Sequence, residues 1–381
     1  MSKIEMQYQV QKHDSAHAEK IRRLQPINEP LLNWFAEHAR KLPWREQPQA
    51  YRVWVSEIML QQTRVEAVKP FYARFLGALP DVKALAECEE DQLLKLWEGL
   101  GYYNRVRNMQ KAAQIVVEQY DGVMPEDYET LLALPGIGSY TAGAVASIAG
   151  GQAVPAVDGN VLRVISRILE SEDDITKQSV KKEIETVLQE VLPKDQPGAF
   201  NQALMELGAT VCLPNGAPNC ICCPVRALCE AGKNGSWDHI PVKAAKKPRR
   251  IEKRTVFVIR DSEHAAIRKR PNRGLLAGLY ELPNQQGHLT QEEALKSVTE
   301  LGFSPIRIKG LEDAKHIFSH VEWQMKGYLV LVEEQEDADG DLLFVEPERT
   351  EREYPIPAAF AAYANYLRIR LGQEKYREET T

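Results

Sequence analysis

The sequence contains no apolar run approaching the roughly 20 residues that an α-helix needs to cross a bilayer. Its N-terminal stretch lacks the apolar segment of a secretion signal, and internal repeats and low-complexity tracts are absent. These absences predict a cytoplasmic protein without a membrane partner. We expect it to work as a monomer.

A strong net charge of one sign is also missing. Lys and Arg number 48 against 54 Asp and Glu, for a net charge of -6, so the overall composition does not indicate a nucleic-acid partner. Any such binding requires a local basic face. The apolar content of 44% and charged content of 27% are typical of globular proteins. A chain of 381 residues exceeds one ordinary core, so two domains are predicted.

Cysteine is scarce, but five of the six cysteines lie between Cys212 and Cys229. In a reducing compartment this crowding favours a metal or cluster over disulfides. Cys212, Cys220, Cys223 and Cys229 offer four thiolates on one loop, which suits a [4Fe–4S] cluster or a zinc ion. Only one Cys-x2-Cys pair is present, whereas zinc sites usually have two, so the cluster is favoured. Cys222 is surplus and could replace a neighbour as ligand.

Helical periodicity dominates residues 28–232, which we expect to form one helical domain that includes the cysteine loop (212–229). The expected helices are Glu29 to Lys41, Tyr51 to Leu76, Ala84 to Trp97, Arg105 to Tyr120, Tyr128 to Leu134, Tyr140 to Ala149, Val161 to Leu169, Gln178 to Leu192 and Gly198 to Val211. Residues 1–27 are polar and aperiodic, which predicts a partly disordered extension.

The composition changes after the cysteines. Within an expected linker at 233–254, residues 243–254 hold seven basic residues and one acidic residue, which suits either a solvated hinge or a segment that tracks phosphates. Residues 255–370 are expected to form an α+β domain, and 371–381 a polar tail. The expected elements of the α+β domain are one helix, Gln291 to Leu301, and the strands Thr255 to Arg260, Ala265 to Lys269, Gly278 to Leu282, Ile306 to Gly310, Ile317 to His320, Gln324 to Val332 and Leu342 to Val345.

Residues 134–138, with the sequence LPGIG, predict a tight hairpin before a helix. Gly136 and Gly138 let the backbone turn and leave amide N–H groups pointing outward, an arrangement that commonly holds a phosphate. Tyr140 and Asp158 follow closely, so a phenol and a carboxylate are near the same turn in sequence. An ordinary helix-loop-helix with a glycine turn would fit this stretch equally well.

The hairpin, the helical domain, the downstream aspartate and the four-cysteine loop together resemble the helix-hairpin-helix DNA glycosylases of the endonuclease III superfamily. Four stretches closely resemble the adenine glycosylases of the MutY type within it, namely Val55 to Thr63, Leu42 to Arg45, Trp97 to Tyr103 and Ala156 to Asn160. The resemblance spans about residues 28–370. The family usually has one residue fewer between its first two cysteines, which leaves Cys220 and Cys222 as alternative ligands.

The resemblance implies a monofunctional DNA glycosylase that acts on double-stranded DNA and removes adenine mispaired with 8-oxoguanine or guanine. Glu57 lies among apolar residues, which should raise its pKa and suit a general acid that protonates the leaving base. Asp158 precedes a helix near Asn160, where N–H groups favour the anion that stabilises or attacks the sugar. The plain alternatives are an exposed helix glutamate and a simple N-cap.

Tyr140 stands where bifunctional members of the superfamily carry a lysine that forms a Schiff base. A phenol cannot form one, so base excision should stop at an abasic site. The resemblance also implies an adenine pocket of Arg40, Trp44, Leu60 and Gln202. It places the intercalating residues at Gln62 and Tyr102 and the contacts to the opposite base at Thr63 and Leu100, while Gly136 and Gly138 would hold DNA phosphate. Tyr102 could alternatively be a core aromatic.

The C-terminal half resembles the Nudix fold, with residues 274–283 similar to the lead-in of that family's motif. The acidic pairs that would hold magnesium are missing from the following helix, which predicts recognition rather than hydrolysis. Phe318, Ser319 and His320 resemble the loop that recognises 8-oxoguanine opposite the adenine, although a strand-end Ser and His is the plain alternative. An endonuclease III-like enzyme for oxidised pyrimidines, a non-catalytic iron–sulfur DNA sensor and a Nudix hydrolase are the rival functions.

Overall fold

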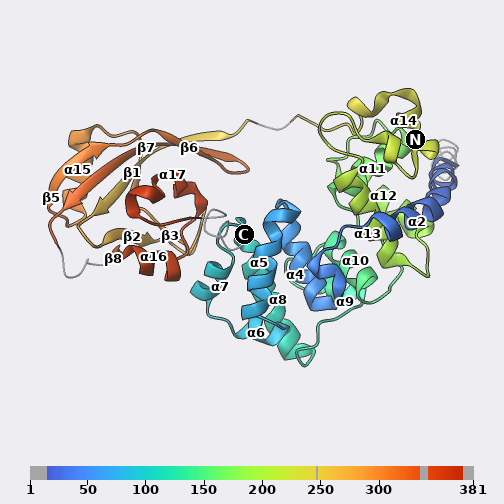
Figure 1. Cartoon of the computed structure of the whole chain (residues 1–381), viewed down its shortest axis with the longest axis horizontal. Helices are drawn as coiled ribbons and strands as arrows, with labels where there is room; N and C mark the ends of the chain where they lie inside the picture. Colours follow the sequence, from blue (N-terminus) through green and yellow to red (C-terminus); the bar gives the residue numbers. More distant parts are fainter. Residues whose placement is uncertain (1–14, 246–247, 335–341, 372–381) are drawn as a thin grey trace, which may run out of the picture. The chain divides into compact units, whose positions relative to one another are not determined.

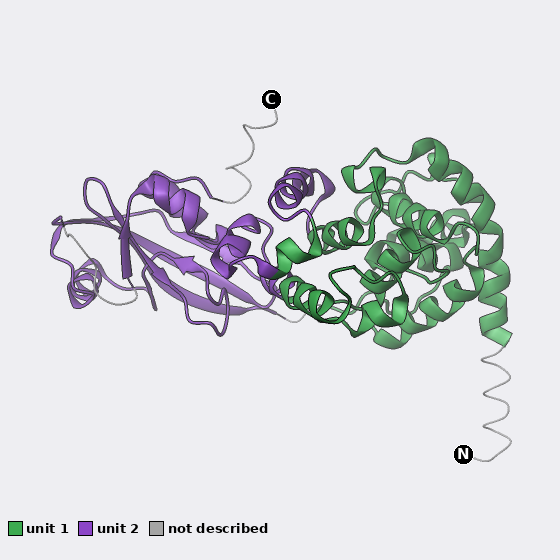
Figure 2. Ribbon diagram, turned by 90° about the horizontal axis from the view of Figure 1, so that it is seen from below, with its two compact units in different colours: residues 1–62, 81–86, 108–245 green, residues 63–80, 87–107, 246–381 purple. Residues whose placement is uncertain are grey.

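The computed structural model describes residues 15–245, 248–334 and 342–371. The chain forms two compact units (Figure 2). Unit 1 comprises residues 1–62, 81–86 and 108–245, and unit 2 comprises residues 63–80, 87–107 and 246–381. The expected single helical domain at 28–232 is therefore divided, because two of its segments pack with the C-terminal half. No helix within the described ranges has the length and apolar character required to span a bilayer.

Unit 1 is helical and has no strand in its described residues (Figure 1). Its elements are η1 (Gln25–Ile27), α2 (Asn28–His38), α3 (Pro43–Glu46), α4 (Ala50–Leu60), α6 (Val82–Glu87), α8 (Asn104–Gln119), α9 (Tyr128–Ala133), α10 (Ser139–Ile148), α11 (Gly159–Leu169), α12 (Gln178–Val191), α13 (Pro197–Thr210), η2 (Cys220–Cys222), η3 (Arg226–Leu228), α14 (Glu230–Asn234) and η4 (Ser236–Asp238). The first residues of α8 belong to unit 2.

Two expected helices are each broken into two. The segment from Tyr51 to Leu76 ends as α4 and restarts as α5 (Val65–Ala78), with Gln62 in the left-handed region at φ 63°. The segment from Ala84 to Trp97 is interrupted between α6 and α7 (Glu90–Leu96). Both breaks fall at short polar stretches, residues 61–64 and 89–92, that contain no glycine or proline to signal a stop. A residue whose backbone is in the left-handed region ends a helix even when that residue is not glycine.

Part of the N-terminal segment, for which the sequence predicts partial disorder, is an ordered portion of unit 1 from residue 15 to residue 27. Residues 15–24 are helical, and Leu24 and Ile27 are fully buried in the core formed with α11, α12 and α13. Asn28 Nδ2 donates to the Val191 carbonyl at 2.8 Å. The few apolar residues of this segment are spaced to face the core, but the polar majority masks that spacing. Residues 1–14 lie outside the described residues.

Close backbone packing around α10 fixes its position relative to α4, α13 and the segment that leads to α11. α10 packs against α4 and α13. A Cβ atom at Gly143 would lie 2.2 Å from the Pro155 carbonyl oxygen, which leaves room only for glycine. The extended segment that leads to α11 therefore lies directly against α10. The starts of α10 and α11 are brought together by this contact.

Unit 2 combines two short stretches of the N-terminal half with a sheet. Its elements are α5, α7, β1 (Arg250–Arg260), β2 (Ala265–Lys269), β3 (Tyr280–Glu281), β4 (Asn284–Gln286), α15 (Gln291–Glu300), β5 (Pro305–Gly310), β6 (Ala314–Ile317), β7 (Val321–Val332), β8 (Leu342–Val345), α16 (Pro347–Glu353), η5 (Ala358–Phe360), α17 (Ala361–Ala364) and η6 (Asn365–Leu367). In the described residues the strands are ordered β3-β2-β1-β7-β5, with β4 beside β1, β6 beside β7 and β8 beside β2.

β1 and β7 form a long parallel pair at the centre of this sheet, and the other pairings are antiparallel. Buried side chains of α15 pack on one face and those of η5, α17 and η6 pack on the other. β1 begins at Arg250, inside the expected linker, because its first residues pair with the start of β7. The expected strand Ile317 to His320 is also wrong, since β6 ends at Ile317 and residues 318–320 form the turn to β7.

Candidate active site

Glu57 lies in α4 with its side chain buried, at 6% exposure. The Tyr140 hydroxyl, from the first turn of α10, donates a hydrogen bond to Glu57 Oε2 and lies 3.3 Å from Met205 Sδ. Burial raises the pKa of Glu57 to about 7, although the Tyr140 hydrogen bond opposes that shift. Loss of water around the carboxylate therefore outweighs the phenol that stabilises it. Near neutral pH, Glu57 is therefore protonated in part of the molecules and ionised in the rest.

Asp158 is the N-cap of α11, as its position before a helix predicts. Its Oδ1 accepts from the Val161 backbone N–H at 2.8 Å, and its Oδ2 accepts from Asn160 Nδ2 at 2.8 Å. Asn160 Oδ1 in turn accepts from Arg163 Nη2 at 2.9 Å. Burial raises the pKa of Asp158 despite these hydrogen bonds, which corrects the expectation that the helix terminus alone would favour the anion.

The two carboxylates and the phenol face one another. Repulsion from Asp158 contributes to the raised pKa of Glu57, and burial together with both carboxylates raises the pKa of Tyr140 well above its ordinary value. Tyr140 is therefore a neutral hydrogen-bond donor. The fold brings Glu57, Tyr140 and Asp158 into one partly buried site from three separate helices. The alternative of an exposed helix glutamate at position 57 is excluded.

A buried ion-pair network lies in the same unit. Glu206, at 1% exposure, accepts from Arg40 Nε at 2.6 Å and from Arg45 Nη2 at 2.9 Å. Although burial acts in the other direction, the two guanidinium groups hold the pKa of Glu206 below its ordinary value. Arg45 Nε also donates to Gln202 Oε1 at 3.1 Å, and its charge opposes the rise in the pKa of Glu57.

The network is only partly visible in the sequence. Arg40 and Gln202 are expected in an adenine pocket. Arg40 pairs directly with Glu206, whereas Gln202 accepts from Arg45, which in turn pairs with Glu206. Arg45 and Glu206 were missed as site residues. The available signal was a carboxylate in the apolar helix α13, which requires a cationic partner when buried. Of the other expected pocket residues, Trp44 is buried and Leu60 is half-buried at the end of α4.

The predicted hairpin is present between α9 and α10. Gly136 has φ 77°, and a Cβ atom there would lie 2.6 Å from Asn108 Cβ, so conformation and space both require glycine. Gly138 precedes α10 as its N-cap in extended backbone, and a Cβ atom at this position would meet no heavy atom within 4 Å. The first N–H groups of α10 therefore begin directly after an open turn.

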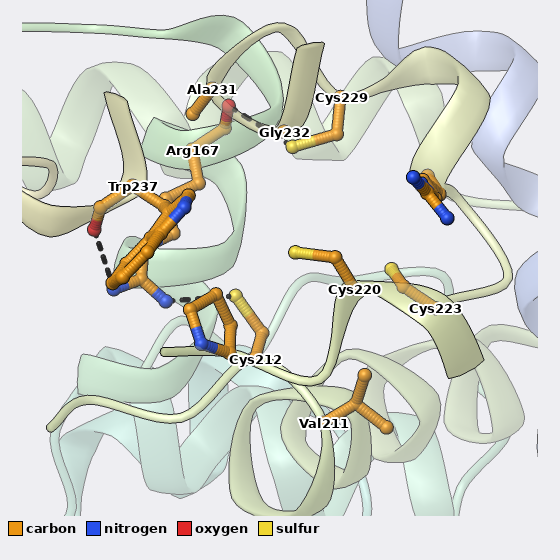
Figure 3. A pocket seen from close by; sticks show the side chains of 11 residues that line it. Arg167, Val211, Cys212, Cys220, Cys223, Cys229, Ala231, Gly232 and Trp237 are labelled. Atoms are coloured by element: carbon orange, nitrogen blue, oxygen red, sulfur yellow. Dashed lines mark hydrogen bonds between the residues drawn. The ribbon is translucent and has the colours of Figure 1, made fainter. Parts of the chain in front are cut away.

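Four of the clustered cysteines line one cavity, which Arg167 and Trp237 also border (Figure 3). They are Cys212, Cys220, Cys223 and Cys229, whereas Cys222 is exposed and does not line it. Burial raises the pKa of Cys223 to about 12, and the neighbouring sulfurs add to the rise. Across the described ranges, no three His, Cys, Asp or Glu side chains converge closely enough to hold a single metal ion.

Unit 2 brings together two stretches that the sequence predicts to read DNA. Tyr102 is 52% exposed with φ 48°, and Gly99 and Gly101 beside it are also left-handed, so the core alternative for Tyr102 is excluded. Its hydroxyl lies 3.0 Å from Ser319 Oγ at the β6–β7 turn. Positive φ values at non-glycine residues are costly and are concentrated at functional sites.

The neighbours of this contact differ in accessibility. Ser319 and His320 are exposed, whereas Phe318 is half-buried with its ring centroid 5.0 Å from that of Trp323. Gln62 is exposed and Thr63 is half-buried. The side chain of Leu100 is only 5% exposed, and its contact to an opposite base stays a prediction. These residues belong to different units, with Gln62 in unit 1 and the rest in unit 2.

A buried carboxylate holds the Tyr102 loop within unit 2. Glu98 is 1% exposed, accepts from the Ile356 backbone N–H at 3.0 Å and pairs with Lys95 at 2.9 Å. Lys95 also donates to the Tyr354 carbonyl at 2.8 Å. Because Glu98 directly precedes Gly99, these bonds tie the base of the loop to residues 354–356.

Comparisons with known proteins agree with this architecture. The family of HhH-GPD superfamily base excision DNA repair proteins matches residues 55–190, and the NUDIX domain family matches residues 255–366. The predicted combination of a helix-hairpin-helix glycosylase fold and a Nudix-like α+β domain is thereby confirmed. A solved structure of a thermostable thymine-DNA glycosylase is similar to this chain at 26% identity and a TM-score of 0.50, covering 56% of this chain and 98% of that one.

Relatives also match across both halves. The adenine DNA glycosylase of Homo sapiens is 34% identical, with 90% of this chain and 74% of the human protein covered. That of Buchnera aphidicola from Acyrthosiphon pisum is 33% identical, with 76% of this chain and 82% of the relative covered.

Replacing Glu57 with Gln should stabilise unit 1 increasingly as the pH rises. The pKa of Glu57 in the folded protein, about 7, lies above its ordinary value of 4.5, so the wild type loses stability as the pH rises through that interval. The variant should avoid up to about 3 kcal/mol of this loss at pH 8. Urea unfolding of both proteins from pH 4 to pH 8 measures it.

Tyr140→Phe provides the internal comparison, because it removes the hydrogen bond that stabilises the Glu57 anion. Its stability should fall more steeply over the same pH range. A difference between wild type and Glu57→Gln that does not vary with pH would contradict the assigned effect of burial.

Proposed function

The chain belongs to the adenine DNA glycosylase family, and we propose that it excises adenine mispaired with 8-oxoguanine or guanine in double-stranded DNA. As a family member it is a hydrolase of base excision repair that cleaves the N-glycosidic bond of adenine. The preferred mispair and the residue roles are the proposal. The observation that supports it most is the meeting of Glu57, Tyr140 and Asp158 in one partly buried site.

Glu57 acts as the general acid. With a pKa of about 7, a large fraction of Glu57 carries a proton at neutral pH and can transfer it to a ring nitrogen of adenine. The electron pair of the glycosidic bond then leaves with the base, and the sugar becomes oxocarbenium-like. Protonation is required because adenine is a poor leaving group as an anion. Glu57, once ionised, is positioned to accept a proton from the water that attacks the sugar.

Asp158 stabilises the positive charge on the sugar. Its oxygens are oriented by the Val161 N–H and by Asn160, so the carboxylate needs little rearrangement when charge develops. Arg163 holds Asn160 in turn, which makes both residues positioning groups. Because burial raises the pKa of Asp158, its anionic form has a high energy before the reaction and gains most when the cationic sugar forms. Direct attack by Asp158 to form a transient covalent bond uses the same geometry.

Tyr140 determines where the reaction stops. A neutral phenol cannot form the Schiff base with the sugar that leads to strand cleavage. Excision therefore yields an abasic site on an intact strand. Glu57, Tyr140 and Asp158 come from one copy of the chain, so a monomer suffices for the chemistry.

Tyr102 and Ser319 read the base opposite the adenine. The exposed ring of Tyr102 can enter the base stack, while Gln62, also exposed and left-handed, serves as a second wedge from unit 1. The hydroxyl–hydroxyl contact couples the wedge to the 318–320 turn. Ser319 then offers a hydrogen-bonding group to 8-oxoguanine. Hydrolysis by the Nudix-like domain is disfavoured, because Glu281 of its motif is committed to Arg268 and Arg270.

A [4Fe–4S] cluster bound by Cys212, Cys220, Cys223 and Cys229 is the proposed cofactor. A zinc ion would need its sulfurs to converge at about 2.3 Å from one point, and the described residues contain no such group. A cluster takes one thiolate per iron, so its ligands stand around a larger body, as they do around this cavity. The bound cluster would crosslink Cys212, just after α13, to Cys229, the N-cap of α14. The exposure of Cys222 disfavours it as a ligand.

Incubation with a duplex that contains one adenine opposite 8-oxoguanine should release free adenine and leave a strand that breaks only after alkali treatment. Glu57→Gln and Asp158→Asn should each slow single-turnover release by about a hundredfold or more, while duplex binding persists. Asn retains the N-cap hydrogen bond, so the second variant should fold. Chromatography of released base and gel analysis of the strand measure both products. Wild-type protein that releases thymine or an oxidised pyrimidine instead would refute the proposal.

Tyr102→Phe and Ser319→Ala should each reduce the preference for 8-oxoguanine over guanine by about two- to tenfold, the value of one neutral hydrogen bond. The double variant should lose no more than either single variant, because both changes remove the same contact. Single-turnover excision rates on the two duplexes give the ratio. Tyr120→Phe, at another exposed tyrosine, should leave it unchanged. If the losses of the two single variants add in the double variant, Tyr102 and Ser319 act independently and the predicted coupling is wrong.

Cys223→Ser should abolish iron and sulfide incorporation, whereas Cys222→Ser, one residue away, should leave both near wild-type content. The physical reason is that, of these two residues, only Cys223 lines the cavity (Figure 3). Metal analysis and the visible absorption of the purified proteins measure the outcome. Retained iron in Cys223→Ser together with its loss in Cys222→Ser would reverse the ligand assignment, and zinc in the wild type would refute the cluster.

A further inference from the structure

One face of the sheet in unit 2 presents a group of exposed residues beside the β6–β7 turn. β7 pairs with β1 on one side and with β6 on the other, so Gln324 lies between Lys253 and Lys315. Residues directly opposed across paired strands project to the same side. We call this surface the lysine face, and it consists of Ile251, Lys253, Lys315, Ile317, Glu322, Gln324 and Lys326.

The lysine face is the part of its sheet face that α15 does not cover. Farther along β7, Tyr328 and Val330 project to the same side and are buried with Ala294 and Val298 of α15. Towards the turn this cover ends, and the side chains of Lys253 and Lys315 are exposed. Half of one sheet face is therefore a core surface, whereas the other half is open to a ligand.

The charge of the lysine face is positive. In the described residues, neither Lys253 nor Lys315 makes an ion pair or a side-chain hydrogen bond, and Lys326 lies 5.6 Å from the centre of the Tyr328 ring. Glu322 is the single acid among the seven residues, and it accepts from Gln324 Nε2 at 3.2 Å. Lysines that are not consumed by local partners are available to an anion.

Two exposed isoleucines accompany these charges. Ile251 is 58% exposed and Ile317 is 47% exposed, and both are opposite Glu322 in the register. Cations beside apolar side chains suit a polymer that alternates phosphate with an apolar-edged sugar. The chemistry of the lysine face thus matches a nucleic-acid backbone.

We propose that the lysine face binds phosphates of the DNA strand that carries the base opposite the target adenine. This inference rests on the proposed function, in which Ser319 reads that base. β6 runs directly into the 318–320 turn, so the lysine face is continuous with the proposed reading site. Lys315 lies four residues before Ser319, about 13 Å along an extended strand.

The spacing of the lysines also fits one strand. β7 separates Lys253 from Lys315, which places their Cα atoms about 10 Å apart. One DNA strand advances about 3.4 Å per nucleotide along the helix axis. Because successive phosphates also rotate about the helix axis, their separation exceeds this rise, and the two ammonium groups match phosphates about one or two nucleotides apart on one side of the opposite base.

The test compares full-length wild type with the Lys253→Gln/Lys315→Gln double variant on a duplex with adenine opposite 8-oxoguanine. The slope of log affinity against log salt concentration should fall in magnitude by about two for two lost phosphate contacts. Single-turnover adenine release at saturating protein should be unchanged, since neither lysine belongs to the catalytic site. A second set of duplexes carries one uncharged methylphosphonate at each phosphate of the opposite strand in turn.

Wild-type affinity should drop at one or two neighbouring positions on one side of the opposite base, and the double variant should be insensitive there. Lys309→Gln is the matched control, because it lies on β5 opposite Leu329 and projects to the other face of the same sheet. A double variant with the wild-type salt slope and the wild-type methylphosphonate pattern would overturn the inference. If wild-type protein binds with this pattern but releases no adenine, the proposed function fails while the lysine face stands.

Discussion

The loss of water around Glu57 is the interaction on which the candidate site depends. α4 buries this carboxylate among apolar neighbours, and its pKa rises to about 7. The neighbouring polar residues reduce the free-energy cost of burying this carboxylate. Tyr140 supplies a hydrogen bond, Arg45 supplies a nearby positive charge, and Glu206 holds Arg45 through a second buried ion pair. A protein of marginal stability retains such a group only where the group has a use, because an apolar residue would be less costly to bury.

Burial acts on two carboxylates but leaves them chemically distinct. Glu57 receives a hydrogen bond from a neutral phenol, whereas Asp158 receives one from a backbone N–H and one from an amide that Arg163 orients. The first environment favours a proton donor and the second stabilises an anion once charge appears beside it. One helical unit thereby holds two carboxylates in different environments, as the proposed acid and electrostatic partner require. In unit 2, a buried carboxylate also positions a proposed functional segment, since Glu98 ties the Tyr102 loop to residues 354–356.

The limits of prediction from sequence are clearest at particular residues. The apolar stretch around Glu57 correctly indicated a buried carboxylate, because the neighbours that bury it are adjacent in the chain. The break after α4 was not visible, because Gln62 is left-handed without being glycine or asparagine. The helix at residues 15–24 was not foreseen, because only a few of its side chains face the core. Arg45 and Glu206 were missed because each joins the site through its ion pair with the other, and the two residues lie far apart in sequence.

The sequence by itself determined the fold class, the family and the residue types available for catalysis, because apolar periodicity, turn residues and short motifs are local properties of the chain. It also determined that position 140 carries a phenol, which cannot form a Schiff base. Only the tertiary structure decided which side chains meet and how strongly burial acts on them. It placed Tyr102 beside Ser319, gave Asp158 a raised pKa where a helix terminus alone suggested the opposite, and left Cys222 outside the cavity. Desolvation and long-range contacts depend on the whole packed chain, so no local pattern records them.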